Sequence, residues 1–306
     1  MSIVEEQISS RSERRSDWGP DDQIGAMNLV TPERTLAALR SVQHGRIIDL
    51  SHELKPGHPC IPFAQVPFFM SLALHADDTR RASRAGGHEN DIGCFTERAE
   101  LCMHSGTHID ALGHFTIGEE MFNGWSYRES VNARGLERLG IEQMPPLVGR
   151  CVLLDVSAFD GGDYLDGGRV ISVDDLKRAQ DKAKAEIQPG DTVAIRTGYS
   201  RFFMKDNERY ITAEPGIDVD AARWLTEQQV AVIGTDNMAV EVLPNPDPKL
   251  LFPVHQHTLV EAGVHLIENL ALDDIAREGV GAFCFVLLTV KFTGATGCPV
   301  RPIAIL

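Results

Sequence analysis

Short strand-like runs alternate with helical segments in the C-terminal half of this chain, and this alternation restricts the possible folds more than any other feature. Three β-branched runs, each bounded by Gly, Pro or Asp as strands usually are, lie at 152–156, 192–195 and 230–233. Helices are expected between them at 172–184 and 218–228. Ser172 and Asp175 have the spacing of a capping box, which marks the start of the first. The alternation predicts an α/β layered fold and argues against an all-β sandwich.

The first third of the chain is richer in strands than in helices. Further strand-like runs are expected at 46–50, 68–74, 97–103 and 283–292. A helix is expected to begin at Pro32, because Thr31 can cap it and proline is tolerated at the first helical position. A short helix is expected at 272–278. We therefore predict an N-terminal arm and helix over 1–45 and one mixed-sheet domain over 46–306.

Composition and charge exclude several classes of function. The formal net charge of −15 repels phosphate backbones, so nucleic acid is not an expected partner. The six cysteines form no CxxC pair, which favours reduced thiols and a cytoplasmic protein. Neither a signal peptide nor an apolar run as long as a membrane span is indicated. The expected partner is a small-molecule substrate, and the polar, charged residues 1–17 predict contacts between copies in a homo-oligomer.

Three histidines and an aspartate fall within eleven positions, at His104, His108, Asp110 and His114. Imidazole and carboxylate together suit zinc, manganese or iron(II). On a helix the pairs His104–His108 and Asp110–His114 would point apart, whereas on a strand all four would share one face. Gly106 disfavours a regular element of either kind. We predict a strand that ends in a turn and starts a helix, so that the first three side chains converge.

The pattern His-x-Gly-Thr-His-x-Asp-x-x-x-His resembles the signature of the cyclase superfamily, which includes bacterial kynurenine formamidases and isatin hydrolases. It is matched at His104, Gly106, Thr107, His108, Asp110 and His114. Leu112 departs from it, because many members carry proline there, and is expected to alter the turn more than the chemistry. Other segments similar to the family lie at 18–22, 28–33, 49–52, 254–255 and 263–270. The resemblance implies a swivelling β/β/α fold and hydrolysis of an amide or cyclic amide.

The resemblance also implies roles for the residues of this segment. His104, His108 and Asp110 would bind a first divalent ion, zinc or manganese. His114 would be the general acid–base. Such an ion would activate water and polarise the substrate carbonyl, while His114 carried the proton to the leaving nitrogen.

A second ion is implied by two later residues. His255 and Glu268 match the positions that bind it in the binuclear formamidases. One manganese suffices in the isatin hydrolases, in which that glutamate is replaced, so one or two ions per chain are possible. His257 competes with His255 for the role, and alignment favours His255.

Aromatic side chains flank the histidine-rich segment in sequence and are candidates to stack on a flat ring. They are Trp18, Phe63, Phe95, Phe115 and Trp125. The resemblance adds an arylformamide- or isatin-like molecule as the expected substrate.

Several other functions use a similar set of residues. A lactone hydrolase or a cyclase would keep the site and change the reaction. An iron(II) oxygenase is possible because His108, Asp110 and a distant histidine match a facial triad, but such enzymes are all-β jelly rolls, which the helices expected at 172–184 and 218–228 contradict. A non-catalytic metal-binding protein would have no need of His114 as a proton carrier.

Overall fold

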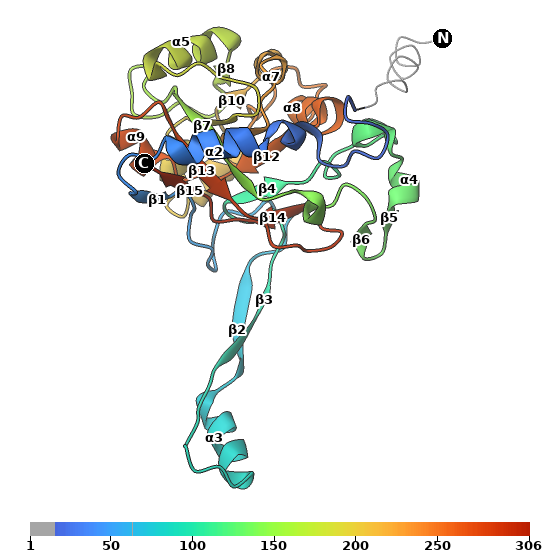
Figure 1. Cartoon of the computed structure of the whole chain (residues 1–306), viewed down its shortest axis with the longest axis vertical. Helices are drawn as coiled ribbons and strands as arrows, with labels where there is room; N and C mark the ends of the chain where they lie inside the picture. The colour runs from blue at the N-terminus through green and yellow to red at the C-terminus, as the bar shows by residue number, and fades with distance from the viewer. Residues whose placement is uncertain (1–15, 63) are drawn as a thin grey trace.

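The centre of the molecule is a mixed sheet, seen in a computed structural model that describes residues 16–62 and 64–306 (Figure 1). Its nine strands follow the order β1-β15-β13-β7-β9-β11-β12-β4-β14. In chain order these strands are β1 Ile47–Asp49, β4 His108–Asp110, β7 Leu147–Asp155, β9 Thr192–Arg196, β11 Val232–Thr235, β12 His265–Glu268, β13 Ala282–Leu287, β14 Gly297–Pro299 and β15 Ile303–Ile305. The predicted α/β fold is confirmed.

The middle of the sheet is parallel and its edges are antiparallel. Strands β7, β9, β11 and β12 run parallel to one another, and the remaining pairings are antiparallel. Successive residues of β7 point to opposite faces, so Val152 and Leu154 join one buried cluster while Cys151 and Leu153 join another. The sheet therefore has an apolar core on each face, as expected for parallel strands covered on both sides.

Four predicted helices are confirmed. Helix α2 (Pro32–Arg40) begins where Thr31 accepts a hydrogen bond from the backbone of Arg34. Helices α5 (Val173–Ala183) and α7 (Val219–Glu227) contact each other, and α5 packs on β7. The expected capping box of Ser172 and Asp175 starts α5. Helix α9 (Asp273–Arg277) is the short helix expected near 272–278.

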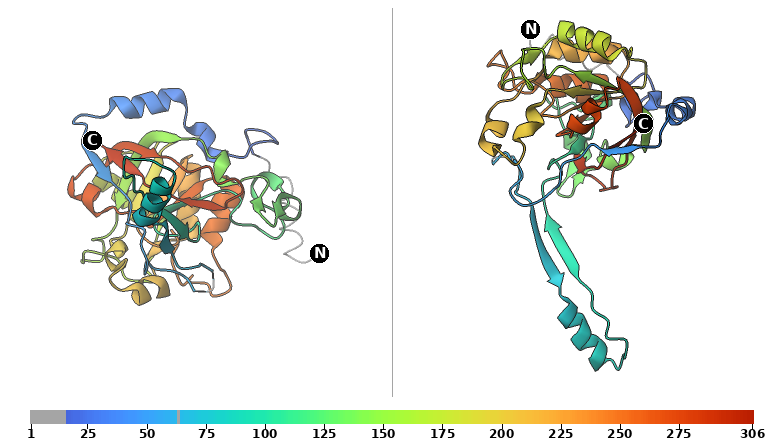
Figure 2. Two further views of the ribbon diagram at one scale, coloured as in Figure 1. Left: turned by 90° about the horizontal axis from the view of Figure 1, so that it is seen from below. Right: turned by 90° about the vertical axis from the view of Figure 1, so that its left-hand side faces the viewer.

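A long arm projects from the sheet-containing body (Figures 1 and 2). It consists of the antiparallel strands β2 (Phe69–Leu74) and β3 (Thr96–Glu100), with helix α3 (Ala76–Ala85) at its tip. The strands predicted at 68–74 and 97–103 thus exist but do not join the main sheet. Most of their side chains are exposed on both faces of the ribbon.

The strand predicted over 283–292 is wrong in its second half. Strand β13 ends at Leu287, which lies opposite Leu147, the first residue of its neighbour β7. Beyond that point no partner strand of the described chain continues the pairing. The apolar side chains of Leu288, Val290 and Phe292 are therefore exposed in a loop instead of buried in a sheet.

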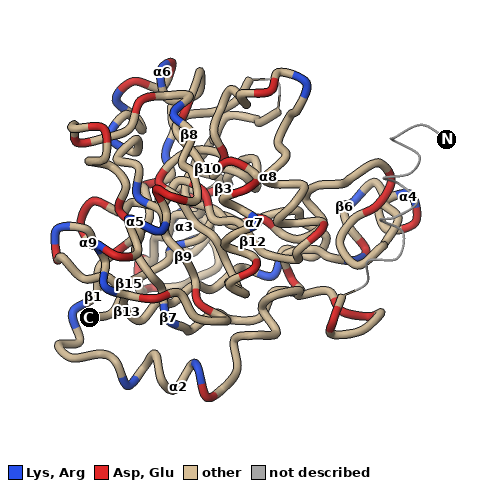
Figure 3. Tube along the Cα trace, turned by 90° about the horizontal axis from the view of Figure 1, so that it is seen from above, with Lys and Arg blue, Asp and Glu red and all other residues tan. Residues whose placement is uncertain are grey.

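The remaining elements are short and lie around this frame. They are η1 Gly25–Leu29, η2 Phe122–Gly124, α4 Tyr127–Ser130, β5 Val131–Asn132, β6 Gly135–Leu136, η3 Ile141–Gln143, β8 Val170–Ile171, η4 Tyr199–Phe202, α6 Asn207–Thr212, β10 Gly216–Ile217, α8 Pro253–His255 and the π-helical turn η5 Gln256–Ala262. Basic and acidic positions are interspersed along the described trace (Figure 3). Among the helices of residues 16–306, none combines the length and the apolar character needed to cross a bilayer.

Candidate metal centre

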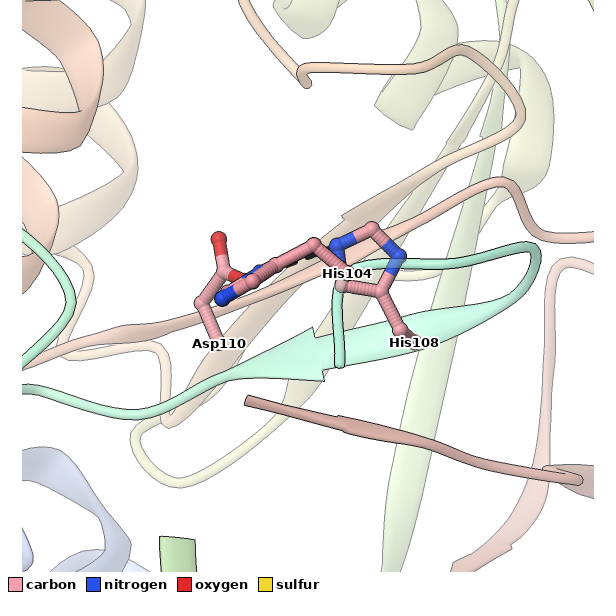
Figure 4. Close-up of side chains that lie close together, drawn as sticks. All are labelled: His104, His108 and Asp110. Atoms are coloured by element: carbon pink, nitrogen blue, oxygen red, sulfur yellow. Dashed lines mark hydrogen bonds and ion pairs between the residues drawn. The ribbon is translucent and has the colours of Figure 1, made fainter. Parts of the chain in front are cut away.

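Strand β4 carries two of the candidate ligands on one face. His108 and Asp110 are two residues apart, so their side chains point the same way, and both are buried. The chain turns just before the strand at Gly106, whose φ of 58° favours glycine. This turn brings His104 back beside Asp110, with Nδ1 2.7 Å from Oδ1 (Figure 4).

The predicted convergence of His104, His108 and Asp110 is therefore observed, but the expected local structure is wrong. The turn precedes the strand, and a loop, not a helix, follows it. The next residue of the loop, Ala111, donates its N–H to Thr296, and Gly113 donates to Leu139. These longer-range bonds satisfy backbone groups that a helix would have paired internally.

Hydrogen bonds fix both histidine rings. His104 Nε2 lies 2.9 Å from the hydroxyl of Thr296, on the side away from Asp110. His108 Nδ1 lies 2.8 Å from the carbonyl of Gly106 and must donate to it, since a carbonyl only accepts. His108 Nε2 then faces the carboxylates, with Asp110 Oδ1 at 3.6 Å and Glu268 Oε2 at 3.2 Å.

Two later segments complete the cluster. Glu268, at the end of β12, lies directly opposite His108 in the antiparallel register. His255, at the end of α8, places Nε2 3.1 Å from Glu268 Oε1 and 3.7 Å from Asp110 Oδ2. The ring of His257 lies elsewhere, bonded to Thr226 and Glu261.

The ligand atoms form two groups that share one carboxylate. His104, His108 and Asp110 make the first, and Asp110, His255 and Glu268 make the second. Within each group the atoms lie within 4.8 Å of one another. Two of these atoms, His108 Nε2 and Asp110 Oδ2, are buried without a hydrogen-bond partner. Such groups cost on the order of 1–3 kcal/mol each when unsatisfied, so imidazole and carboxylate atoms at these positions fit divalent metal ions.

The raised pKa values of His108 and His255 indicate an excess of negative charge in the cluster. Burial lowers the pKa of His108, but Glu268 and Asp110 outweigh it and raise that pKa to about 9. Burial also lowers the pKa of His255, but Glu241 and Glu268 outweigh it and raise that pKa to about 10. A metal cation would take the place of these protons.

His114 lies at the wall of a cavity beside the cluster. Its ring stacks on His104 with centroids 3.9 Å apart and an interplanar angle of 21°. Burial, only partly offset by Asp110, lowers the pKa of His114 to about 3, so the imidazole is neutral at pH 7. The cavity has a volume of about 180 Å³ and a largely apolar wall formed by Ile61, Ala64, Phe115, Met238, Ala239 and Phe252.

Most aromatic residues predicted to bind substrate lie away from this cavity. Trp18 lines a different hollow with Phe122. Phe95 lies on the arm against His75, and Trp125 packs under the guanidinium of Arg138 at 3.8 Å. Nearness to the motif in sequence does not bring these three to it in space.

Phe63 lies outside the described residues, and Phe115 does line the cavity. Sequence reasoning missed Phe252, which lies opposite Phe115 with ring centroids 5.7 Å apart. Its place three residues before His255 was the available signal.

The family model for putative cyclases matches residues 48–242, more than half of the chain. The chain belongs to the cyclase family. The kynurenine formamidase of Bacillus cereus is 27% identical over 209 residues, which cover 66% of this chain and 76% of that protein. Cyclase-like protein 3 of Arabidopsis thaliana is 24% identical over 262 residues, covering 85% and 79%.

Solved structures agree with this membership. A crystal structure of a cyclase superposes with a TM-score of 0.84 at 30% identity, covering 94% of this chain and 98% of that one. Isatin hydrolase A of Labrenzia aggregata superposes with a TM-score of 0.64 at 20% identity, covering 89% and 97%, and shows the shared fold. The swivelling β/β/α fold and the prediction of a hydrolase of this family are confirmed.

Proposed function

We propose that this cyclase-family protein hydrolyses an amide or cyclic amide with the help of two divalent ions, zinc or manganese. The observation that carries the proposal is the pair of ligand groups joined by Asp110 beside a cavity with a largely apolar wall. His104 and His108 would hold the first ion, and His255 and Glu268 the second. The relatives named as formamidase and isatin hydrolase support the amide class.

Charge supports two ions over one. Asp110, Glu268 and Glu241 are three carboxylates buried in or beside the cluster. One divalent ion would leave a net negative charge among neutral imidazoles, and unpaired buried charge is costly. Two divalent ions offset all three carboxylates and leave positive charge to stabilise a developing oxyanion.

The roles of the other residues follow from their positions. Bound divalent ions of this kind activate water and polarise a carbonyl group. The neutral imidazole of His114 accepts a proton from the attacking water and returns it to the leaving nitrogen. Phe115 and Phe252 line the cavity beside the cluster and would stack on a flat ring, which fits an arylformamide- or isatin-like substrate.

Metal removal tests the proposal directly. Dialysis against a chelator should abolish hydrolysis of aryl formamides or isatin, and zinc or manganese should restore it. Assays with lactones and cyclic imides test for hydrolysis of other substrates at the same site. Measurement of oxygen uptake tests for an oxygenase. Full amide hydrolysis by metal-free protein would contradict the proposal.

The number of ions has its own test. Glu268→Gln should lower the metal content from two ions per chain towards one, because a neutral amide is a poorer ligand than a carboxylate. The measurement is elemental analysis of the purified protein. A fully active wild-type chain that binds one ion would refute the second site and leave the first intact.

The arm supports the further proposal of a homo-oligomer. Among residues 16–62 and 64–306, none forms a second layer on either face of its two-stranded ribbon, and such ribbons are marginally stable alone. Exposed apolar side chains on or beside it, at Phe69, Met70, Leu72, Ile92 and Phe95, would be covered by another copy.

A further inference from the structure

Glu241 is a fully buried carboxylate that touches the backbone and the ring of His255. Its Oε1 accepts the backbone N–H of His255 at 3.0 Å and lies 2.6 Å from His255 Nδ1. Its Oε2 accepts the backbone N–H of Val254 at 3.3 Å. A single carboxylate thus holds both the end of α8 and the orientation of the imidazole that α8 carries.

The contact determines which ring nitrogen of His255 faces the cluster. A carboxylate only accepts hydrogen bonds, so Nδ1 must carry the hydrogen. Nε2 is then directed at Glu268 and Asp110, at 3.1 Å and 3.7 Å. A metal-binding imidazole gains basicity and a fixed orientation from such a carboxylate on its other nitrogen.

The loop that carries Glu241 is itself held rigidly. Glu214, also fully buried, accepts the backbone N–H groups of Met238 and Ala239 at 2.7 and 2.8 Å. The backbone of Glu241 passes so close to Gly216 that a Cβ there would lie 2.2 Å from its carbonyl carbon. This packing leaves the carboxylate little freedom to move away from His255.

We propose that Glu241 is the positioning residue of the second metal site, acting through His255 without binding the ion itself. The inference rests on the proposed binuclear function, because it assigns His255 to a metal ion. It goes beyond the ligand set, since no residue of the histidine-rich motif makes this contact.

The chain offers a matched control in a second histidine–glutamate pair. His257 Nδ1 lies 2.9 Å from Glu261, one helical turn along η5. The other nitrogen of His257 lies 2.9 Å from the hydroxyl of Thr226, so this ring faces no candidate ligand. Removing the charge of Glu261 should leave both metal sites unchanged.

The test is a titration of metal-free protein with Mn²⁺. Binding is measured by calorimetry and by the spin-coupled electron paramagnetic resonance signal of a manganese pair. Glu241→Gln should lower the affinity for the second ion about ten- to hundredfold and leave the affinity for the first unchanged. This is the usual effect of losing the hydrogen-bond partner of a metal-binding histidine. Glu261→Gln should give the wild-type titration. Circular dichroism checks that each variant is folded.

The outcomes separate this inference from the function on which it rests. If the wild type binds two ions and Glu241→Gln binds both with the same affinities as the wild type, the role of Glu241 is overturned and the binuclear function stands. One ion in the wild type would overturn the binuclear function and the inference together. Nitrogen NMR of the Zn²⁺-loaded wild type gives a measurement independent of any variant. Nδ1–H with a metal-bound Nε2 is expected for His255, and the reverse assignment would overturn the proposal.

Discussion

Single side chains determine what the cavity can do, and His114 is the clearest case. It stacks on His104 and lines the cavity, so a reactant bound there can exchange a proton with its ring. His114→Ala should lower kcat by about 10²–10⁴-fold, the usual range for acid–base catalysis, with the metal content unchanged. Steady-state kinetics and elemental analysis check the two halves of this prediction. Loss of metal in proportion to activity would instead make His114 a ligand.

His52 gives a prediction about stability and pH. Its ring stacks on Phe203 at 4.3 Å, and Nε2 is buried without a partner. Burial, with a smaller contribution from Lys205 and against Asp273, lowers its pKa to about 4. The unfolded chain binds this proton near pH 6.5, so the free energy of unfolding should fall as pH drops from 6.5 to 4.

Replacement of His52 by phenylalanine keeps the stacking and removes the titration. Between pH 6.5 and 4, the free energy of unfolding should fall by about 1–3 kcal/mol less in His52→Phe than in the wild type. Urea unfolding of metal-free protein at several pH values measures the difference. His88→Phe, at an exposed position on the arm, is the control. Parallel pH profiles for wild type and His52→Phe would show that His52 is not the titrating group.

At the scale of elements, the close pairing of β4 with β14 keeps His104 in place. Gly297 lies opposite Asp110, and a Cβ there would lie 2.7 Å from His104 Cε1. Gly297→Ala should displace the ring and weaken binding of the first ion roughly tenfold, a shift typical of disturbed ligand support. Metal titration measures it. Gly149→Ala in β7, where the nearest atom is 3.5 Å away, should leave the affinity unchanged.

The same scale shows why part of the structure could be predicted and part could not. Helix α5 was predictable because its capping box and apolar spacing are local signals. Strand β4 has three residues, too few to show a periodicity, and its neighbours in the sheet lie more than 150 positions later. The first three ligands are close enough in sequence for spacing to indicate a site. His255 and Glu268 came only from resemblance, and Glu241 had no sequence signal.

At the scale of the whole molecule, the arm is the part that we propose contacts a second copy of the chain. Phe69 lies opposite Glu100, so an Asn-Gly turn can replace residues 70–99 without straining the pairing. If the arm joins copies, this shortened chain should be monomeric in light-scattering measurements while the wild type is not. Replacing only residues 75–95 keeps the ribbon and tests α3 separately. A monomeric wild type would contradict the proposal.

The place of β4 in the sheet also has a consequence for biosynthesis. Its hydrogen-bonded neighbours are β12 and β14, so strand β4 has no partner strand in this sheet until residues 265–268 have left the ribosome. Chains grow at about 5–20 residues per second, so residues 104–110 wait roughly ten seconds or more for these partners. A nascent chain that stops before residue 265 lacks Glu268 and the strand on which it lies, so its second ligand group is incomplete and binding of the second ion would be a late event.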